Sequence, residues 1–370
     1  MTSQSVRRSP LFQVMMMVLA VGSAMLLASC KQDLSADQRW LETATRQIVQ
    51  DHRELAELTA KQHEQAQSFC RAPSEAGLAK MQERWRKSMA AWQRLQWLRL
   101  GPITHDNDDW KLQFWPDKKN ILQRKIQVIL DGTDPVTADT LSHASVVVQG
   151  FSAQELLLFD AGFASVEKFK SRQCDLIMAS TALTAKVAGR LADAWQDKSW
   201  LQTWFSPAVT HEGVTPAQTR DGELLDALLA QSEKIKAAKL GEPMGLKTRD
   251  KKPNGYFSES WRSQNSLANI HSNLAAFQQL ATPKQGYGLF QYLKDKKHDD
   301  IAEQLVIHLD NVLLAMQQIQ LPLSQAVMDP SQQDALQASV RSLGELETFL
   351  KKQLAPALEL SLGFNSNDGD

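Results

Sequence analysis

The sequence predicts an all-α protein in which two helical bundles pack side by side. Apolar residues recur at three- and four-residue intervals through most of the chain, which is typical of amphipathic helices. No window alternates apolar and polar residues with the β-branched enrichment of a strand. Turn-forming residues gather near 204–207 and 241–255. We therefore expect an N-terminal bundle at 37–205, a C-terminal bundle at 206–362 and a flexible tail at 363–370.

The first 29 residues predict a lipoprotein signal peptide. Two arginines precede a nearly continuous apolar stretch, which ends in small residues directly before Cys30. In a bacterial lipoprotein this cysteine is acylated and becomes the mature N-terminus, so residues 30–36 are expected to be a tether to the membrane. Lys31 follows the cysteine instead of aspartate, which favours the outer membrane and a protein that faces the periplasm. A transmembrane anchor is the alternative interpretation.

Two cysteines remain after processing, Cys70 and Cys174. In an oxidising periplasm we expect them to form a disulfide that closes a loop of about 100 residues. Two separate buried thiols are the alternative. Neither cysteine has a second cysteine or a histidine at ligand spacing, so a cysteine-based metal site is not expected.

The charge balance excludes one class of partner. The chain has 41 Lys and Arg against 42 Asp and Glu, and removal of the two signal arginines leaves 39 against 42. Because there is no basic surplus, we expect no nucleic-acid partner. The mature chain of about 340 residues is long enough for one large or two ordinary domains.

The helices follow in order from apolar spacing and end signals. One long helix is expected at 37–69, and a second begins at Ser74, which can cap it, and ends at Gly101. The aromatic-rich connection at 105–120 is expected to be irregular. Further helices are expected at 119–131, 137–160, 165–196, 216–240, 259–282, 297–320 and 331–357.

A buried site is predicted within the apolar run at 146–159. If this run is helical, Ser152 and Glu155 share one face. A buried carboxylate is costly unless it is paired, hydrogen-bonded or bound to a metal. Gly150 costs about 1 kcal/mol relative to alanine inside a helix, so it also requires a packing or access reason. We therefore interpret the run as a functional site.

Two other stretches place polar residues in apolar settings, at 92–102 and 259–270. One hypothesis is that an arginine from either stretch, Arg94 or Arg262, neutralises Glu155 across the domain interface and so forms a polar cleft with Ser266 on the same face as Arg262. The other is that Ser258 caps a helix with a solvated face. The pairs 85–86 and 261–262 are both Trp-Arg in comparable settings, which suggests an internal duplication.

Read together, these pieces resemble the imelysin family, helical signal-bearing proteins that are found near bacterial iron-uptake genes. The matching segments are 69–70, 90–93, 101–102, 114–120, which contains Trp115 and Asp117, 150–159, and 259–263, which contains Trp261 and Arg262. The resemblance implies two helical bundles with a functional site near their junction. It also implies a G-x-H-x-x-E motif, on which some members have been classed as metallopeptidases.

In this chain the motif reads Gly150-x-Ser152-x-x-Glu155, with serine in place of histidine. Serine is a poor ligand for zinc or iron(II), whereas imidazole is a good one. No His-Glu-x-x-His, glycine-rich phosphate loop or Gly-x-Ser-x-Gly elbow is present. We therefore expect a non-enzymatic binding component of iron uptake, in which Glu155 lines a pocket for a small ligand, a metal complex or a partner.

Two alternatives stay open. The first is a metallopeptidase with a non-standard site, in which Glu155 and a histidine from elsewhere, His105 or His143, hold iron or another divalent metal. The second is a scaffold that docks a periplasmic partner through an exposed apolar patch.

Overall fold

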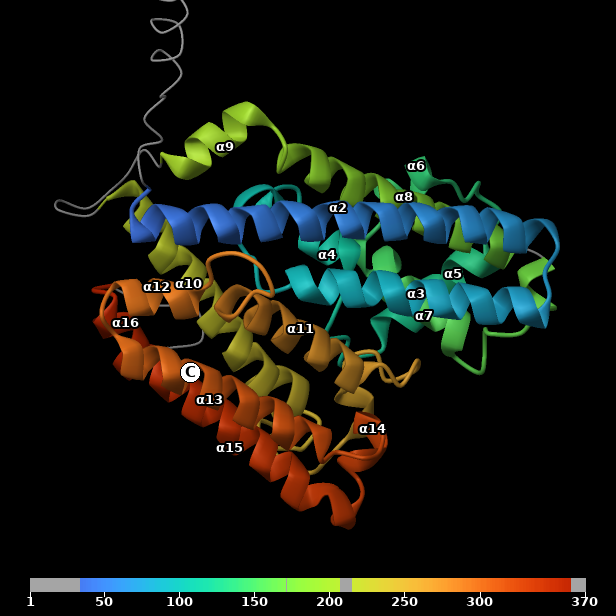
Figure 1. Cartoon of the computed structure of the whole chain (residues 1–370). Coiled ribbons are helices and arrows are strands. Elements are labelled where there is room, and N and C mark those ends of the chain that lie inside the picture. The colour runs from blue at the N-terminus through green and yellow to red at the C-terminus, as the bar shows by residue number, and fades with distance from the viewer. Residues whose placement is uncertain (1–33, 171, 207–214, 361–370) are drawn as a thin grey trace, which may run out of the picture. The chain divides into compact units, whose positions relative to one another are not determined.

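The computed structural model describes residues 34–170, 172–206 and 215–360. All regular secondary structure in these residues is helical, which confirms the predicted all-α class (Figure 1). In the same residues no helix is both long and apolar enough to cross a membrane. The described residues from Ala36 onward form one compact unit. The predicted signal peptide, Cys30, Lys31, most of the tether and the tail at 363–370 lie outside the described residues.

Three long helices build the N-terminal half of this unit. Helix α2 (Ala36–Arg71) packs against α3 (Glu75–Leu95) and α8 (Arg172–Ala194), and the three run side by side in Figure 1. Ser74 caps α3 as predicted, because its Oγ accepts a hydrogen bond from the Gly77 amide at 3.2 Å. The predicted disulfide is confirmed and joins the end of α2 to the start of α8 through Cys70 and Cys174.

Along the chain, short elements connect α3 to α8, and one more follows α8. They are η2 (Gly101–Thr104), α4 (Asp108–Leu112), α5 (Ile121–Asp131), α6 (Ala138–Ser142), η3 (Val146–Val148), α7 (Gly150–Phe159), η4 (Lys168–Lys170) and α9 (Lys198–Phe205). The prediction of a single helix at 137–160 is therefore wrong, because α6, η3 and α7 occupy this range. The Gln149 side chain donates to the carbonyls of Leu141 and Ala144, both at 2.9 Å, and closes a turn where the helix would have continued.

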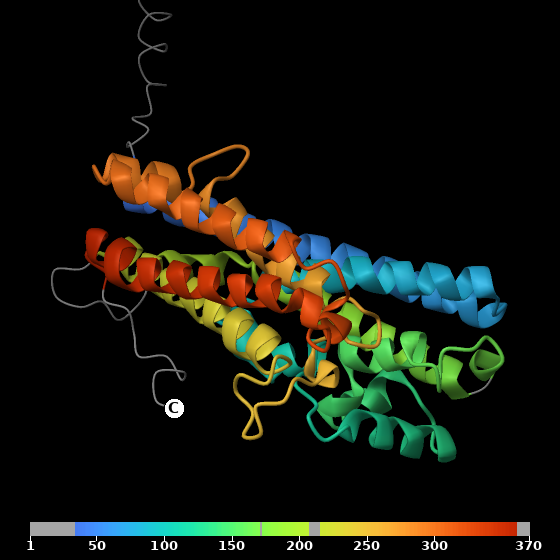
Figure 2. The ribbon, with the colours of Figure 1, turned by 90° about the horizontal axis from the view of Figure 1, so that it is seen from below.

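The C-terminal half is a second group of helices. Its elements are α10 (Pro216–Lys234), the π-helical η5 (Ile235–Gly241) that continues α10, η6 (Gly255–Phe257), α11 (Ser266–Ala281), α12 (Leu289–Asp295), α13 (Asp299–Gln317), α14 (Leu323–Ala326), η7 (Pro330–Gln332), α15 (Gln333–Phe349), η8 (Leu350–Leu354) and α16 (Ala355–Ala357). The view in Figure 2 shows the red α15 running along the yellow α10, which it contacts.

The helix expected at 259–282 begins only at Ser266. Residues 258–265 form a turn, in which Ser260 and Gln264 have φ values of 52° and 56° that an α-helix does not contain. Ser258 therefore does not cap the helix that was expected to begin at 259. Trp85 lies inside α3 whereas Trp261 lies in this 258–265 turn, so the structure does not support the duplication suggested by the two Trp-Arg pairs.

Two hydrophobic cores fill the unit, and α2 belongs to both. Its residues Leu55 and Phe69 lie in the core of the N-terminal half, while Trp40 and Ile48 lie in the core that α10–α16 build. Trp204 of α9 also belongs to the second core. The boundary at 205/206 stays a prediction, and the packing shows that the first turns of α2 are part of the C-terminal core.

Candidate functional site

Helix α7 lies between the long helices of the N-terminal half and is buried from Gly150 to Leu158. Gly150 begins it with a φ of 66°. A Cβ atom at this position would come within 2.2 Å of the Leu112 carbonyl oxygen and 2.3 Å of that of Lys111. The glycine is therefore required by its backbone conformation and by the close approach of α4. The sequence predicted a packing or an access reason for Gly150, and this close approach is a packing reason.

Ser152 and Glu155 face the same side of α7 but have different partners. The Ser152 hydroxyl donates to the Phe114 carbonyl oxygen at 2.8 Å and holds the 113–116 segment against α7. Glu155 Oε1 accepts hydrogen bonds from Ser263, at 2.9 Å from its amide and 2.8 Å from its hydroxyl. Oε2 accepts no hydrogen bond from any described residue. The two side chains thus join α7 to two separate loops.

Burial controls the protonation of Glu155, whose residue is 6% exposed. Desolvation is the largest cause of a rise in the pKa of this carboxyl to about 6, and the nearby Glu259 carboxylate contributes to the same rise. The Ser263 hydrogen bonds and the positive charge of Arg262 act in the opposite direction without reversing the shift. Glu155 is therefore mostly an anion at pH 7 and becomes neutral in mildly acidic solution.

A cavity of about 390 Å³ opens beside Ser152 and Glu155, and we call it the Glu155 cavity. The 113–116 segment and the 258–265 turn form much of its wall. Its aromatic lining includes Phe114, Trp115, Tyr256 and Trp261. A volume of this size suits a small organic ligand.

Two charged residues that the sequence placed at the site do line the Glu155 cavity, and both already have partners. Arg262 pairs with Asp160 through Nε at 2.9 Å and lies over the Trp261 ring at 4.4 Å. The Asp117 carboxylate accepts from the amides of Ile121 and Leu122 at 2.8 and 2.9 Å, so it caps α5. Arg262 therefore stabilises the Glu155 anion at a distance and forms no ion pair with it.

Two other predicted site residues lie elsewhere. Arg94 of α3 pairs with Asp51 and Glu54 on α2 and does not line the cavity, so the hypothesis that it neutralises Glu155 is wrong. Ser266 donates to the carbonyl of Glu259 and fixes the end of the 258–265 turn. Ser266 was expected on one face with Arg262 of a helix through 259–270, but the helix begins only at Ser266.

One buried ion pair, between Lys239 and Glu259, was not predicted from the sequence. Lys239 and Glu259 are each 1% exposed, and Lys239 Nζ lies 2.9 Å from Glu259 Oε2. Burial alone would raise the pKa of Glu259, but the Lys239 ammonium and its hydrogen bonds hold this pKa below its usual value. Gln93 of α3 and Gln113 donate to the same carboxylate, so the pair links the two helical halves. Lys239 follows Leu228 and Ile235 at helical spacing, a signal that could have placed it on the buried face.

The side chains around Glu155 do not fit a tightly held metal. Glu155 Oε2 is a free carboxylate oxygen, but Asp117 and Asp160 are bound to a helix terminus and to arginine. Neither His105 nor His143 lines the Glu155 cavity. Among the described residues, no group of three or more His, Cys, Asp or Glu side chains could hold a metal ion. A tight catalytic site would need at least three such ligands.

Two features define the class of protein. The unit is all-helical, and Glu155 of the Gly-x-Ser-x-x-Glu motif lies at a cavity between α7 and the 258–265 turn. The imelysin family model matches residues 48–350, so the chain belongs to the imelysin family. It is 22% identical over 309 residues to iron-regulated protein A of Synechococcus elongatus, a match that covers 81% of each chain.

Two solved structures share the fold. One is an imelysin-like protein from Psychrobacter arcticum, with a TM-score of 0.76, 19% identity, and coverage of 90% of this chain and 99% of that one. The other, an iron-regulated protein A precursor from Parabacteroides distasonis, has a TM-score of 0.61 and 17% identity, with coverage of 89% and 96%. At these identities the likeness concerns the fold.

Proposed function

We propose that this chain is a non-enzymatic binding protein of iron acquisition, and that the Glu155 cavity takes a small iron chelate. The observation that carries the proposal is the state of Glu155. Its Oε1 is fixed by Ser263, and its Oε2 is an acceptor without a hydrogen bond from the described residues, at the wall of a cavity of about 390 Å³. The name of the Synechococcus relative supports the link to iron.

The chemistry of the lining favours a chelate over a bare ion. A bare cation would need several oxygen or nitrogen ligands, and Glu155 offers one free oxygen. A chelate brings its own ligands to the metal and presents hydroxyl donors and apolar surface to the protein. Glu155 Oε2 can accept from such a hydroxyl, while Trp115 and Trp261 provide flat apolar walls.

The serine at position 152 argues against peptide hydrolysis. Its hydroxyl already donates to the Phe114 carbonyl, and it cannot replace a histidine as a metal ligand. Peptide hydrolysis by a metallopeptidase needs a metal to activate water, and among the described residues no group of three or more His, Cys, Asp or Glu side chains could hold one.

Equilibrium dialysis against radiolabelled ferric citrate tests the proposal. We expect saturable binding by the mature protein, weakened at least about tenfold by Glu155→Gln because the amide replaces the anionic acceptor. Glu57→Gln, at an exposed side chain of α2, is the matched control and should bind like the wild type.

A protease assay tests the non-enzymatic part. Incubation of the protein with a labelled general protein substrate and added zinc or iron(II) should give no cleavage above background. Cleavage that a chelator abolishes, together with stoichiometric metal retained after desalting and lost in Glu155→Gln, would contradict the proposal and favour the metallopeptidase.

We propose further that the chain is exported and anchored by lipid at Cys30 on the periplasmic face of the outer membrane. The two signal arginines, the apolar stretch and the small residues before Cys30 support this location. Labelled palmitate should enter the wild-type protein in a bacterial host and not the Cys30→Ser variant, and the wild type should fractionate with outer membranes. Recovery of unlabelled wild type in the soluble fraction would contradict the anchor.

A further inference from the structure

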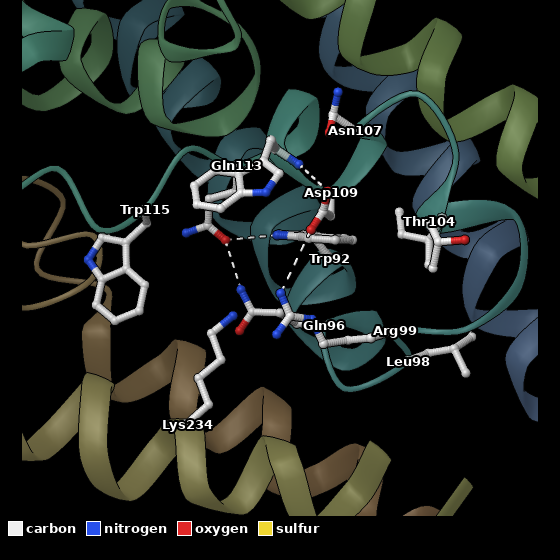
Figure 3. A pocket seen from close by; sticks show the side chains of 12 residues that line it. Trp92, Gln96, Leu98, Arg99, Thr104, Asn107, Asp109, Gln113, Trp115 and Lys234 are labelled. Carbon is white, nitrogen blue, oxygen red and sulfur yellow. Dashed lines mark hydrogen bonds and ion pairs between the residues drawn. The ribbon is translucent and has the colours of Figure 1, made fainter. Parts of the chain in front are cut away.

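A second cavity, of about 330 Å³, adjoins the 113–115 segment, and we call it the Lys234 cavity (Figure 3). Gln113 and Trp115 line both cavities. The rest of its wall comes from the end of α3 and the loop after it, from η2 and α4, and from the last residue of α10. It is large enough for a small ring compound.

Lys234 reaches this cavity from the end of α10 (Figure 3). Its ammonium has no hydrogen bond or ion pair within the described part of the chain. Lys239, one π-helical turn further, is fully satisfied by Gln93, Glu259 and Asn273 at 2.7 to 2.9 Å. The Glu259 charge is therefore taken by Lys239, and Lys234 has no anionic partner of its own among the described residues.

The other charges around Lys234 do not supply that anion. Arg99, Asp109 and the two members of the Lys239–Glu259 pair are the groups that act on it. Arg99 and Asp109 stand near each other, with 3.9 Å between the guanidinium and the carboxylate. Burial, followed by repulsion from Lys239, lowers the pKa of Lys234 to about 7.

An unsatisfied acceptor lies in the same wall. Gln96 is 8% exposed, and its Nε2 donates to Gln113 Oε1 at 3.2 Å. Its Oε1 is buried and has no hydrogen-bond partner in the described residues. Buried amide oxygens are nearly always paired, so this one marks a place for a donor on a ligand. The indoles of Trp92 and Trp115 provide flat walls beside it (Figure 3).

We propose that the Lys234 cavity binds a small planar ring carboxylate that carries an N–H or O–H donor beside the carboxylate. The carboxylate pairs with the Lys234 ammonium, the donor satisfies Gln96 Oε1, and the ring packs against indole. This ligand site is separate from the one proposed at Glu155.

Three isosteric probes separate the contributions of the carboxylate charge and of the N–H donor to binding. Isothermal titration calorimetry of the mature protein measures their affinities. Indole-2-carboxylate has both the anion and the donor, benzofuran-2-carboxylate lacks the N–H, and indole-2-carboxamide lacks the charge. We expect indole-2-carboxylate to bind at one site, about fivefold more tightly than the benzofuran and at least about tenfold more tightly than the amide.

Two variants assign the binding to this cavity. Lys234→Met should weaken indole-2-carboxylate at least about tenfold. Lys80→Met, at an exposed lysine of α3, is the control and should bind like the wild type. Gln96→Met should abolish the preference for indole over benzofuran and leave carboxylate binding in place. Glu155→Gln should leave all three affinities unchanged, which keeps this test independent of the iron proposal.

The pH dependence supplies a second readout. Because the carboxylate needs a protonated lysine, binding by the wild type should weaken on the order of tenfold between pH 6.5 and 8.5. Lys234→Met should show no such decline. Equal affinity for acid and amide, full binding by Lys234→Met, or no binding of indole-2-carboxylate at millimolar concentration would overturn the proposal.

Discussion

Single residues of α7 and the turn opposite it determine what the Glu155 cavity can do. Gly150 permits α4 to approach, Ser152 holds the 113–116 segment, and Glu155 accepts from Ser263 across the junction of the halves. Each of these side chains serves packing as well as the cavity. Stability measurements on their variants therefore test these packing contacts independently of ligand binding.

Gly150→Ala should destabilise the protein by at least about 2 kcal/mol. The new Cβ would meet the carbonyl oxygens of residues 111 and 112, and φ is 66°. Gly189→Ala is the matched control, because Gly189 lies inside α8, where an added Cβ would meet no described atom within 4 Å beyond its chain neighbours and its own helix backbone. It should be neutral or stabilising. Urea unfolding measures both, and equal stabilities for the two variants would contradict the close approach at Gly150.

Glu155→Gln should alter stability in a pH-dependent way. The folded pKa is raised to about 6 from 4.5, so this carboxyl favours folding below about pH 4.5, and that contribution is lost as pH rises through 6. Relative to wild type, the variant should therefore gain about 2 kcal/mol between pH 4 and pH 7. Urea unfolding across this range, with Glu57→Gln as control, measures the gain. A stability difference that does not change with pH would show that the carboxyl is not desolvated.

At the scale of elements, the sequence predicted long amphipathic helices well and predicted their interruptions poorly. The apolar stripes of α2 and α13 and the cap at Ser74 are local signals, and they gave nearly correct bounds. The breaks at 143–149 and 258–265 depend on contacts distant in sequence. A left-handed φ at Ser260 and the approach of Glu155 to Ser263 have no local signal.

Local signals also determine which site residues can be predicted from the sequence. Gly150, Ser152 and Glu155 are unusual within an apolar run, so the sequence alone could single them out. Gln113 and Lys234 become part of one cavity only when the last residue of α10 comes near the loop after α3. Such contacts join segments that are distant in sequence, and helical periodicity cannot predict them.

The Cys70–Cys174 disulfide joins two elements whose residues are 104 apart in sequence. Its removal in Cys70→Ser/Cys174→Ser should lower the free energy of unfolding by about 3–5 kcal/mol, because the unfolded chain gains the freedom of a long open loop. Urea unfolding of the double variant and of oxidised wild type measures the effect. An unchanged midpoint would contradict it.

At the scale of the whole unit, α2 and the Lys239–Glu259 pair join the two cores. Helix α2 contributes apolar side chains to both, and the Glu259 carboxylate receives donors from the 113–116 segment, α3 and η5. We therefore expect residues of both halves to unfold together in one transition.

Lys239→Met should destabilise the protein by about 3–5 kcal/mol, since it leaves the Glu259 carboxylate buried without its cation. Replacement of both members, as Lys239→Met/Glu259→Gln, should recover much of that loss, and Lys80→Met should have little effect. Calorimetry and tryptophan fluorescence should report one coincident transition for each variant. Two separate transitions in the wild type would show that the halves are independent.

We propose that the Glu155 cavity binds an iron chelate and that the protein does not cut peptides. The most direct measurement is an anomalous difference map, collected at the iron absorption edge, from crystals of the mature protein grown with ferric citrate. We expect one iron peak inside the Glu155 cavity, with citrate between the metal and Glu155 Oε2. A cavity without an iron peak at saturating ferric citrate would contradict the account, as would iron coordinated directly by Glu155 and a histidine.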